Sequence, residues 1–345
     1  MRPLLLDTPS AASRVVFQHS FSSETAMQPA SEQQHPSQRY TSMKRAAHSL
    51  HECTSADDFQ QLFESSTRLT LKELVWRVVI PSAPQAVFVV GSLAQGMAAS
   101  GSDVDLIALI DSKDYLSTNT RTVNNTRELQ FASEADPLLA GIYLTMHEGI
   151  LIDLQVAISP AIRSVYKRLR QRGPELNETE VQTLGRISTG WLLWETDDYL
   201  ERNGIRLKEP TLEVYCCTKQ FVSALHQQSK AERALQCNDV PLALQHGRAG
   251  VEYAYLAFLA SDGHPHLGSK WLAQLGHARG AAERMRQSPL LEQGLRLLFP
   301  AYPSTPSEAA AYVAAVSEYL KSMRELIERK TLFRIAFNAC PQISE

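Results

Sequence analysis

Three short apolar segments, each followed by turn-forming or polar residues, constrain the fold of this chain more than any other feature. They cover Ala86–Val90, Val104–Ile110 and Ile150–Ile158, and all are rich in Val, Ile and Leu. Runs of this length and composition, bounded by Gly, Ser or Pro, are typical of buried strands. The sequence therefore predicts a small β-sheet in the first half of the chain.

Two aspartates open the second of these segments. Side chains alternate between the faces of a strand, so Asp103 and Asp105 point to one face. The residues that point the other way are apolar and predict a core there: Val104, Leu106, Ala108 and Ile110. The α-carbons of the two acids stand roughly 6–7 Å apart, a distance that one divalent ion can bridge. Magnesium binds a few carboxylates together with phosphate oxygens and water, so the pair predicts a Mg²⁺ site.

A third carboxylate stands in the last segment. Ile152, Leu154, Val156 and Ile158 form an apolar face there, and Asp153 lies on the opposite face. A lone acid in such a strand is costly unless it has a partner or a role. If this strand neighbours the one that begins with the two aspartates, three carboxylates converge and divalent cations relieve their repulsion. The alternative is a solvated acid on an edge strand.

The residues between the first two strands suit a nucleotide. Gly91 and Ser92 follow the first strand, and ten residues separate them from Asp103. Glycine lets backbone approach a phosphate closely. The hydroxyl and backbone N–H of the next residue can hold terminal phosphates at a helix start. Ser102, just before the first aspartate, is a further phosphate donor in this reading.

Together these residues resemble a known signature. A Gly-Ser pair, ten residues, Asp-Val-Asp and a later strand-borne aspartate are similar to the pattern of the nucleotidyltransferase superfamily, which includes DNA polymerase β, aminoglycoside nucleotidyltransferases and minimal nucleotidyltransferases. The resemblance covers roughly residues 70–160. It implies a mixed sheet flanked by helices, with Mg²⁺ on Asp103 and Asp105. It also implies that Asp153 assists as a base or electrostatic anchor.

The rest of the chain divides around this core. Residues 1–50, rich in Ser, Gln, Pro and His, predict a disordered N-terminal extension. We expect a nucleotidyltransferase domain over 51–160, with a helix or hairpin within 113–148. After Pro160 the chain reads helical, which predicts a helical acceptor-binding domain over 161–335. The expected fold class is α+β: a small mixed β-sheet core flanked by helices, followed by an all-α bundle.

The helical stretches of that second region are recognisable from their composition and caps. The last helix carries Thr305 as cap, Pro306 at its first position and Glu308 for a capping box. An apolar stripe at helical spacing follows: Ala309, Val313, Val316, Leu320, Met323 and Ile327. The other predicted helices cover 161–172, 212–228, 241–260 and 269–286.

Composition limits the environment and the partners. The formal net charge is -3, without the basic excess that proteins tracking long nucleic acid usually carry. The five cysteines form no CxxC pair, which argues against a disulfide framework or a zinc site. No apolar run reaches the roughly 18 residues needed to span a bilayer. We expect a cytoplasmic protein that binds an NTP and a small-molecule acceptor, without membrane contact.

Other conspicuous residues have plainer interpretations beside the functional ones. Lys270 could neutralise nucleotide phosphate, or be a solvated helix lysine. His264 and His266 lie in an Asp-Gly-His-Pro-His segment, which favours a turn over a metal site. The tryptophans Trp191, Trp194 and Trp271 are interpreted as core, and Asp111 as a residue that caps its strand.

Three functions are compatible with these residues. The first is Mg²⁺-dependent transfer of NMP, by default AMP from ATP, to a hydroxyl or amine of a small molecule, with release of pyrophosphate. The second is transfer to a protein or an RNA end, for which a basic cluster after the third strand is the cue: Arg163, Lys167, Arg168, Arg170 and Arg172. The third is a non-catalytic, antitoxin-like or regulatory binding protein of the same fold.

Overall fold

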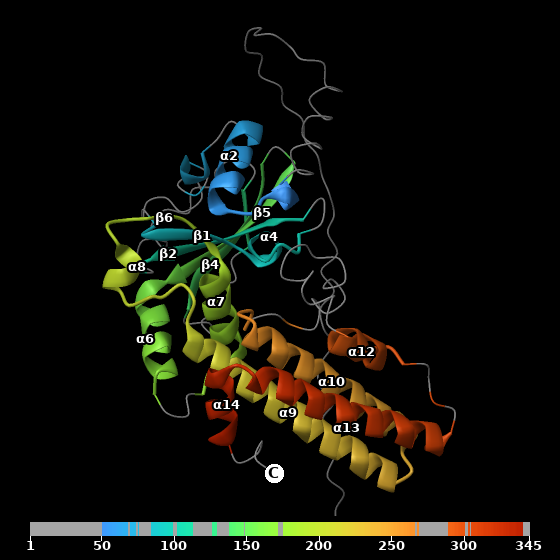
Figure 1. Cartoon of the computed structure of the whole chain (residues 1–345). Helices are drawn as coiled ribbons and strands as arrows, with labels where there is room; N and C mark the ends of the chain where they lie inside the picture. The colour runs from blue at the N-terminus through green and yellow to red at the C-terminus, as the bar shows by residue number, and fades with distance from the viewer. Residues whose placement is uncertain are drawn as a thin grey trace, which may run out of the picture.

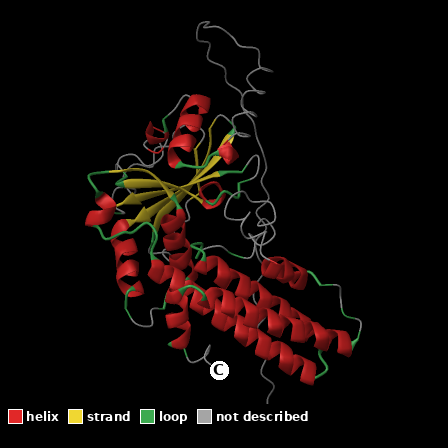
Figure 2. Ribbon diagram, in the orientation of Figure 1, coloured by secondary structure: helices red, strands yellow, loops and turns green. Residues whose placement is uncertain are grey.

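The chain folds into a β-sheet with helices on both faces, joined to a bundle of long helices (Figures 1 and 2). The computed structural model describes residues 50–67, 70–73, 75, 84–98, 102–112, 126–129, 138–147, 149–171, 175–265, 268, 289–300, 303 and 305–340. The predictions for residues 1–49, His266, Lys270, Trp271 and the helix over 269–286 lie outside these residues.

The sheet has six strands in the order β3-β4-β5-β2-β1-β6. The three predicted strands are confirmed at their predicted bounds, as β1 (Ala86–Val90), β2 (Val104–Ile110) and β5 (Ile150–Ile158). Strand β2 is antiparallel to β1 and parallel to β5. The sheet is therefore mixed, as expected, and its two acid-bearing strands are neighbours at its centre.

The segment before β5 forms a hairpin. Strands β3 (Thr126–Leu129) and β4 (Leu139–His147) pair antiparallel, and β4 then pairs with β5. Gly149, between β4 and β5, has φ +80°, which glycine adopts without steric cost. Of the two alternatives for residues 113–148, the hairpin is confirmed.

One strand was not expected. Residues Trp191–Glu195 form β6, which pairs antiparallel with β1 at the edge of the sheet. The interpretation that the chain is helical throughout after Pro160 is wrong at this strand. Trp191 and Trp194 are half-buried there and pack against the sheet core, which confirms their interpretation as core residues.

Two apolar cores lie on the two faces of the sheet. On one face, α2 (Ala56–Thr67) packs Phe59 and Phe63 against the apolar side chains of β1, β2 and β5. The predicted inward side chains of β2 belong to this core: Val104, Leu106, Ala108 and Ile110. On the other face lie α6 (Ser159–Leu169) and α7 (Glu178–Thr189), shown below the sheet in Figure 1. This second face is the one that carries the three aspartates.

The second core continues without a break into the helical bundle. The short helix α8 (Tyr199–Arg202) lies beside the sheet and α6 (Figure 1). The helices of the bundle that the structure describes are α9 (Pro210–Gln236), α10 (Val240–Ser261), α12 (Pro289–Leu298), α13 (Pro306–Glu328) and α14 (Thr331–Asn338). The capping box of Thr305 and Glu308 on α13 is confirmed. Every residue of the predicted α13 stripe is buried. Sheet and bundle therefore share one apolar interior.

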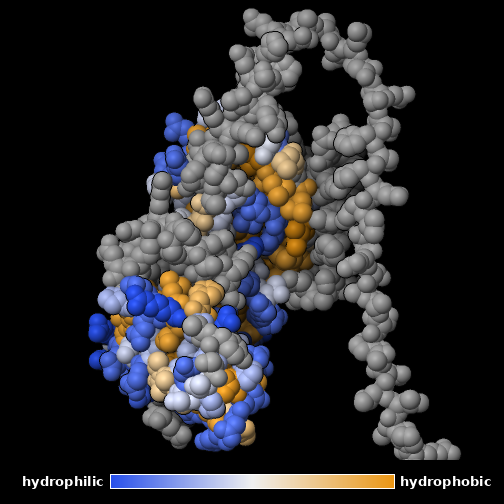
Figure 3. Space-filling view, turned by 90° about the vertical axis from the view of Figure 1, so that its right-hand side faces the viewer, coloured by the Kyte–Doolittle hydropathy of each residue, from blue (hydrophilic) through white to orange (hydrophobic). Residues whose placement is uncertain are grey.

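The helical end of the molecule presents mostly hydrophilic side chains with scattered apolar ones, whereas an apolar band lies nearer the sheet (Figure 3). Among the described residues, no helix combines the length and the apolar character that crossing a membrane requires.

Candidate active site

The strand register places the predicted acids side by side. Asp105 of β2 pairs with Asp153 of β5, and the two strands run parallel. Neighbouring strands lie about 4.8 Å apart, and paired residues of parallel strands point to the same face. The α-carbons of these two acids are therefore neighbours, well inside the reach of one shared ion. The expectation that the Asp153 strand neighbours the Asp103–Asp105 strand is confirmed, and the edge-strand alternative is wrong because β5 lies between β4 and β2.

Asp153 lies in surroundings that disfavour the charged form of its carboxyl. It is half-buried, and its Oδ1 is sealed from solvent without a hydrogen-bond partner in the structure. Burial raises the pKa of this carboxyl above its usual value, and the charge of Asp103 raises it further. Arg186 of α7 and the Gln155 side chain act in the opposite direction. An unsatisfied, buried carboxylate oxygen calls for an explanation such as an ion, a water or a catalytic role.

Gly91 is required by its contact with Asp105. It follows β1 and opens the short helix α4 (Gly91–Ala94), with φ +71°. A Cβ atom at this position would lie 2.0 Å from Oδ2 of Asp105. The carboxylate thus packs directly on the backbone of the predicted phosphate-binding turn. Ser92, the next residue, is buried, and its carbonyl oxygen accepts a 2.8 Å hydrogen bond from the backbone N–H of Met97.

A cavity of about 480 Å³ opens beside this turn. One wall is formed by Ala94 and Gln95, at the end of α4. The opposite wall comes from the ends of bundle helices and their turns: Lys208, Glu213, Ser261, Asp262, Gly263, His264 and Lys330. Ser188 and Thr189, at the end of α7, complete the lining.

The cavity lies close to the acids along two separate elements. Gln95 is four residues from Gly91, which corresponds to about 6 Å along a helix. Ser188 is two residues beyond Arg186, the arginine that acts on Asp153. The three aspartates are not part of the cavity lining, and α4 and α7 are the elements that connect the two places. A hydrogen bond between the side chains of Gln95 and His264 joins the turn to the bundle across this space.

The remaining predicted site residues differ in placement. Asp103 is exposed at the start of β2, and Ser102 beside it is half-buried. Asp111, interpreted as a strand cap, lies directly after β2 and accepts a hydrogen bond from the hydroxyl of Tyr199. Arg186 was not predicted, because an arginine on an amphipathic helix gives no local signal of its target.

The acids fit a divalent cation in donor type but do not form a finished cage. In the part of the chain that the structure describes, no group of three or more His, Cys, Asp or Glu side chains is arranged to hold a metal ion. The buried, unpartnered Oδ1 of Asp153 and the neighbouring Asp105 are the hard oxygen donors that Mg²⁺ prefers. Magnesium commonly keeps waters and substrate phosphates as ligands, so a complete protein cage is not required.

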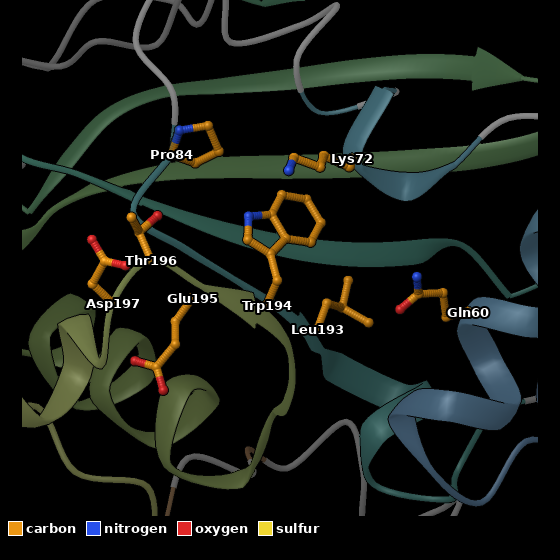
Figure 4. Close-up of a pocket in the computed structure, with 8 residues that line it drawn as sticks. All are labelled: Gln60, Lys72, Pro84, Leu193, Trp194, Glu195, Thr196 and Asp197. Carbon is orange, nitrogen blue, oxygen red and sulfur yellow. The ribbon is translucent and has the colours of Figure 1, made fainter.

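A second cavity, of about 390 Å³, lies on the other face of the sheet (Figure 4). Trp194 stands at its centre, with Lys72, Gln60 and Asp197 around it. Glu195 points away from it, and its carboxylate accepts a 2.9 Å hydrogen bond from the backbone N–H of Leu200. Because the three aspartates occupy the opposite face, this cavity is separate from the candidate active site.

No protein-family model and no curated protein matches the chain. Among solved structures, it is similar to a nucleotidyltransferase-like protein from Exiguobacterium sibiricum 255-15. The sequence identity is 11%, the TM-score is 0.38, and the alignment covers 76% of this chain and 78% of that one. At this TM-score the similarity carries no argument about activity. The functional assignment therefore depends on the geometry of the site.

Proposed function

We propose that the protein is a Mg²⁺-dependent nucleotidyltransferase that transfers NMP from an NTP, by default ATP, to a hydroxyl or amine of a small molecule. The observation that carries this proposal is the in-register pairing of Asp105 with Asp153, next to a buried carboxylate oxygen that has no partner. A pure binding protein would gain stability by replacing such a group with a neutral one. Its retention favours a role in catalysis.

Each residue has a distinct role in the proposed reaction. Asp103 and Asp105 would hold Mg²⁺, which supplies charge neutralisation at the phosphates when bound. The backbone N–H groups of the turn at Gly91 and Ser92 would hold the terminal phosphates, with the neighbouring Ser102 as a further donor. The acceptor oxygen or nitrogen forms a bond to the α-phosphorus, the bond to the β-phosphate oxygen breaks, and pyrophosphate leaves. The acceptor proton passes to Asp153.

The raised pKa of Asp153 suits a base. A carboxylate of ordinary acidity is a weak proton acceptor near neutral pH, and burial together with the charge of Asp103 makes this one stronger. Arg186 acts in the opposite direction and limits this shift. Holding the two substrates in line, between the turn and the bundle, would supply much of the remaining rate.

Transfer to RNA is less well supported. The basic cluster after β5 was its cue, and two of its members are engaged within the protein. Arg168 forms an ion pair with Glu180, and Arg170 forms one with Glu209 at 3.1 Å. Phosphate binding at these positions would compete with the existing pairs. The small-molecule acceptor is therefore preferred over a nucleic acid.

Pyrophosphate release tests the proposal. The purified protein with Mg²⁺ is incubated with each of four NTPs and pools of small hydroxyl and amine compounds. Asp105→Ala is expected to reduce turnover by more than the roughly 10- to 100-fold that loss of an outer-shell metal partner costs. The exposed Asp57→Asn on α2 is the matched control and keeps full activity. Wild-type-like turnover in Asp105→Ala would falsify the assignment.

A further inference from the structure

The charged groups around the cavity beside α4 fall into two sets. Lys330 is already engaged: its ammonium donates to the carbonyl oxygen of Ser261 and lies 3.3 Å from Oδ1 of Asp262, with which it forms an ion pair. This pair closes one side of the cavity. Lys330 also acts on Glu213, whose pKa it lowers more than Lys208 does, but it forms its ion pair with Asp262.

The other set is unpartnered. Glu213, in the first turn of α9, is half-buried and makes no hydrogen bond or ion pair with any described residue. Its Oε1 lies 3.9 Å from the position that a Cβ on Gly263 would occupy, so it faces the turn after α10. Burial raises the pKa of this carboxyl, Lys330 and Lys208 lower it, and Asp262 raises it. A half-buried carboxylate of this kind is stabilised by a cationic partner.

Lys208 carries the complementary open charge. It is exposed at the cavity rim, in the left-handed conformation with φ +62°, and its backbone N–H donates to the carbonyl oxygen of Ser188 at 3.2 Å. Its ammonium forms no ion pair with a described acid, although its charge acts on Glu213. The charges of Lys208 and Glu213 therefore interact, but the two side chains do not form an ion pair.

His264 supplies a hydrogen-bonding group to the same cavity. Its Nδ1 forms a hydrogen bond with Oε1 of Gln95. In the tautomer that carries the proton on Nδ1, this nitrogen is the donor and Nε2 is left as an acceptor. Nε2 makes no hydrogen bond within the described part of the chain. Burial lowers the pKa of this imidazole, with Asp262 opposing and Lys330 assisting, which keeps the ring neutral at physiological pH. A hydroxyl in the cavity could donate to this nitrogen.

We propose that this cavity is the acceptor site and that the acceptor is a small zwitterion carrying a hydroxyl. Its ammonium group pairs with Glu213, its carboxylate or phosphate pairs with Lys208, and its hydroxyl donates to Nε2 of His264. This inference rests on the proposed nucleotidyl transfer: the hydroxyl donates to His264 while the acceptor is bound, and its proton passes to Asp153 when its oxygen forms the bond to the α-phosphorus. Hydroxylated amino acids have this chemistry.

The charges that line the cavity favour a zwitterion over a polycation or a polyanion. The lining holds two acids and two lysines, Glu213, Asp262, Lys208 and Lys330, so the cavity favours neither a polycation nor a polyanion. A polycationic amino sugar would place an ammonium against one of the lysines. A sugar phosphate without an amine would leave Glu213 unpaired. A zwitterion alone neutralises both open groups and leaves the Lys330 pair intact.

The test compares three acceptor classes on the full-length protein. Serine, threonine and homoserine represent zwitterions, polyamine sugars represent polycations, and glucose 6-phosphate represents anions. Pyrophosphate release with ATP and Mg²⁺ is measured for each. We expect turnover with at least one zwitterion. Glu213→Gln should raise its KM roughly 10- to 100-fold, the range for loss of a charged hydrogen-bonded pair, with the KM for ATP unchanged. Lys208→Gln should act in the same direction, more weakly because Lys208 is exposed.

Two exposed substitutions control for surface charge. Glu201→Gln on α8 matches Glu213→Gln, and Lys230→Gln on α9 matches Lys208→Gln. Both are expected to leave every kinetic constant unchanged. Thermal unfolding of each variant shows whether it is folded. The preference of the wild-type protein among the three acceptor classes is measured without any variant. It is therefore a test that does not depend on the folding of the variants.

Kinetic and binding measurements test the acceptor site separately from nucleotidyl transfer. Turnover of polycations or anions only, or an unchanged acceptor KM in Glu213→Gln, overturns the zwitterion site while nucleotidyl transfer stands. A raised KM for ATP in Lys208→Gln, with the acceptor KM unchanged, assigns Lys208 to the nucleotide and also overturns it. Calorimetric titration of the same zwitterions without ATP shows whether the protein binds them even if it does not catalyse transfer. Binding that Glu213→Gln abolishes, without pyrophosphate release from any NTP, keeps the site and removes the transfer.

Discussion

The two sides of the candidate active site are built in opposite ways. On the sheet side, Asp105 and Asp153 stand opposite each other in a register fixed by a parallel strand pair. On the bundle side, the polar groups come from the ends of elements: the first turn of α9, the turn after α10, and the residue before α14. A strand register allows little adjustment, because a shift of one residue reverses every side chain. Helix ends and turns can change with little effect on the core.

This contrast separates chemistry from recognition. In the proposed reaction, the sheet side would supply the charges that transfer needs, irrespective of the acceptor. The bundle side would decide which acceptor can lie beside them. Substitutions on the sheet side should therefore abolish turnover with every acceptor, and substitutions on the bundle side should change the acceptor KM. Substitutions on each side test whether the two sides differ in this way.

The strongest test on the sheet side is Gly91→Ala. The added Cβ would lie 2.0 Å from Oδ2 of Asp105, so the carboxylate has to move, and φ +71° adds backbone strain. Turnover should fall to the level of Asp105→Ala with all acceptors. The free energy of unfolding should drop by roughly 1–3 kcal/mol, the usual cost of such strain. Pyrophosphate release and urea unfolding measure the two effects.

Gly204→Ala is its matched control. Gly204 has φ +63°, and a Cβ there would meet no atom within 4 Å. It carries the same kind of backbone strain without displacing a carboxylate. It should therefore lose stability and keep its specific activity. Equal loss of activity in both variants would show that Gly91 matters through strain alone, not through its contact with Asp105.

The next largest effect concerns Asp153, whose substitution should lower turnover and raise the free energy of unfolding. Because burial and the charge of Asp103 raise the pKa of Asp153, its ionised form is disfavoured in the folded protein. Asp153→Asn removes that charge with little change of shape. Turnover should be lost, while the free energy of unfolding near neutral pH should rise on the order of 1 kcal/mol. Thermal unfolding beside the activity assay checks both parts.

Asp103→Asn gives the comparison for this prediction. Asp103 is exposed, so its charge is well solvated and its removal relieves little cost. Turnover should fall as in Asp153→Asn, with a smaller gain in stability. A destabilised Asp153→Asn would indicate instead that the interaction with Arg186 outweighs burial, and that Asp153 has a structural role.

The same contrast explains what the sequence could predict. Strands β1, β2 and β5 were predicted at their observed bounds because their apolar runs are continuous and end at polar residues or turns. The face of Asp103, Asp105 and Asp153 followed from strand alternation alone. Their convergence depended on β2 and β5 being neighbours, which no local pattern states.

Strand β6 and the cavity were not predicted from the sequence, for different reasons. Trp191-Leu-Leu-Trp-Glu is short, lacks alternation and lies between two helices, so the helical context dominated its interpretation. Gly190 before it and the Thr-Asp-Asp segment after it were available as boundary signals. The cavity residues Gln95, Lys208, Glu213 and His264 lie far apart in sequence and have no common spacing. Only the tertiary fold brings them together, with the hydrogen bond between Gln95 and His264 as the direct link.

The smallest predicted effect is a pH dependence on the bundle side. Burial lowers the pKa of His264 below its ordinary value of 6.5, with Lys330 assisting and Asp262 opposing. The unfolded chain therefore binds this proton first as the pH falls, and folding stability declines from about pH 6.5 down to the lowered pKa. His264→Asn retains a donor to Gln95 without a titrating ring. Its unfolding free energy should fall less than that of the wild type between pH 7 and 5.

The exposed His226→Asn on α9 is the control for that measurement and should keep the wild-type slope. Urea unfolding at several pH values gives the slopes directly. A wild-type slope in His264→Asn would mean that the imidazole is solvated and free to take up a proton in the folded state. The Gln95–His264 bond would then not hold the ring neutral, and the turn beside Gly91 would be coupled to the bundle by packing alone. The bundle wall would in that case be even more adjustable than its placement at helix ends suggests, while the sheet side would keep its fixed register.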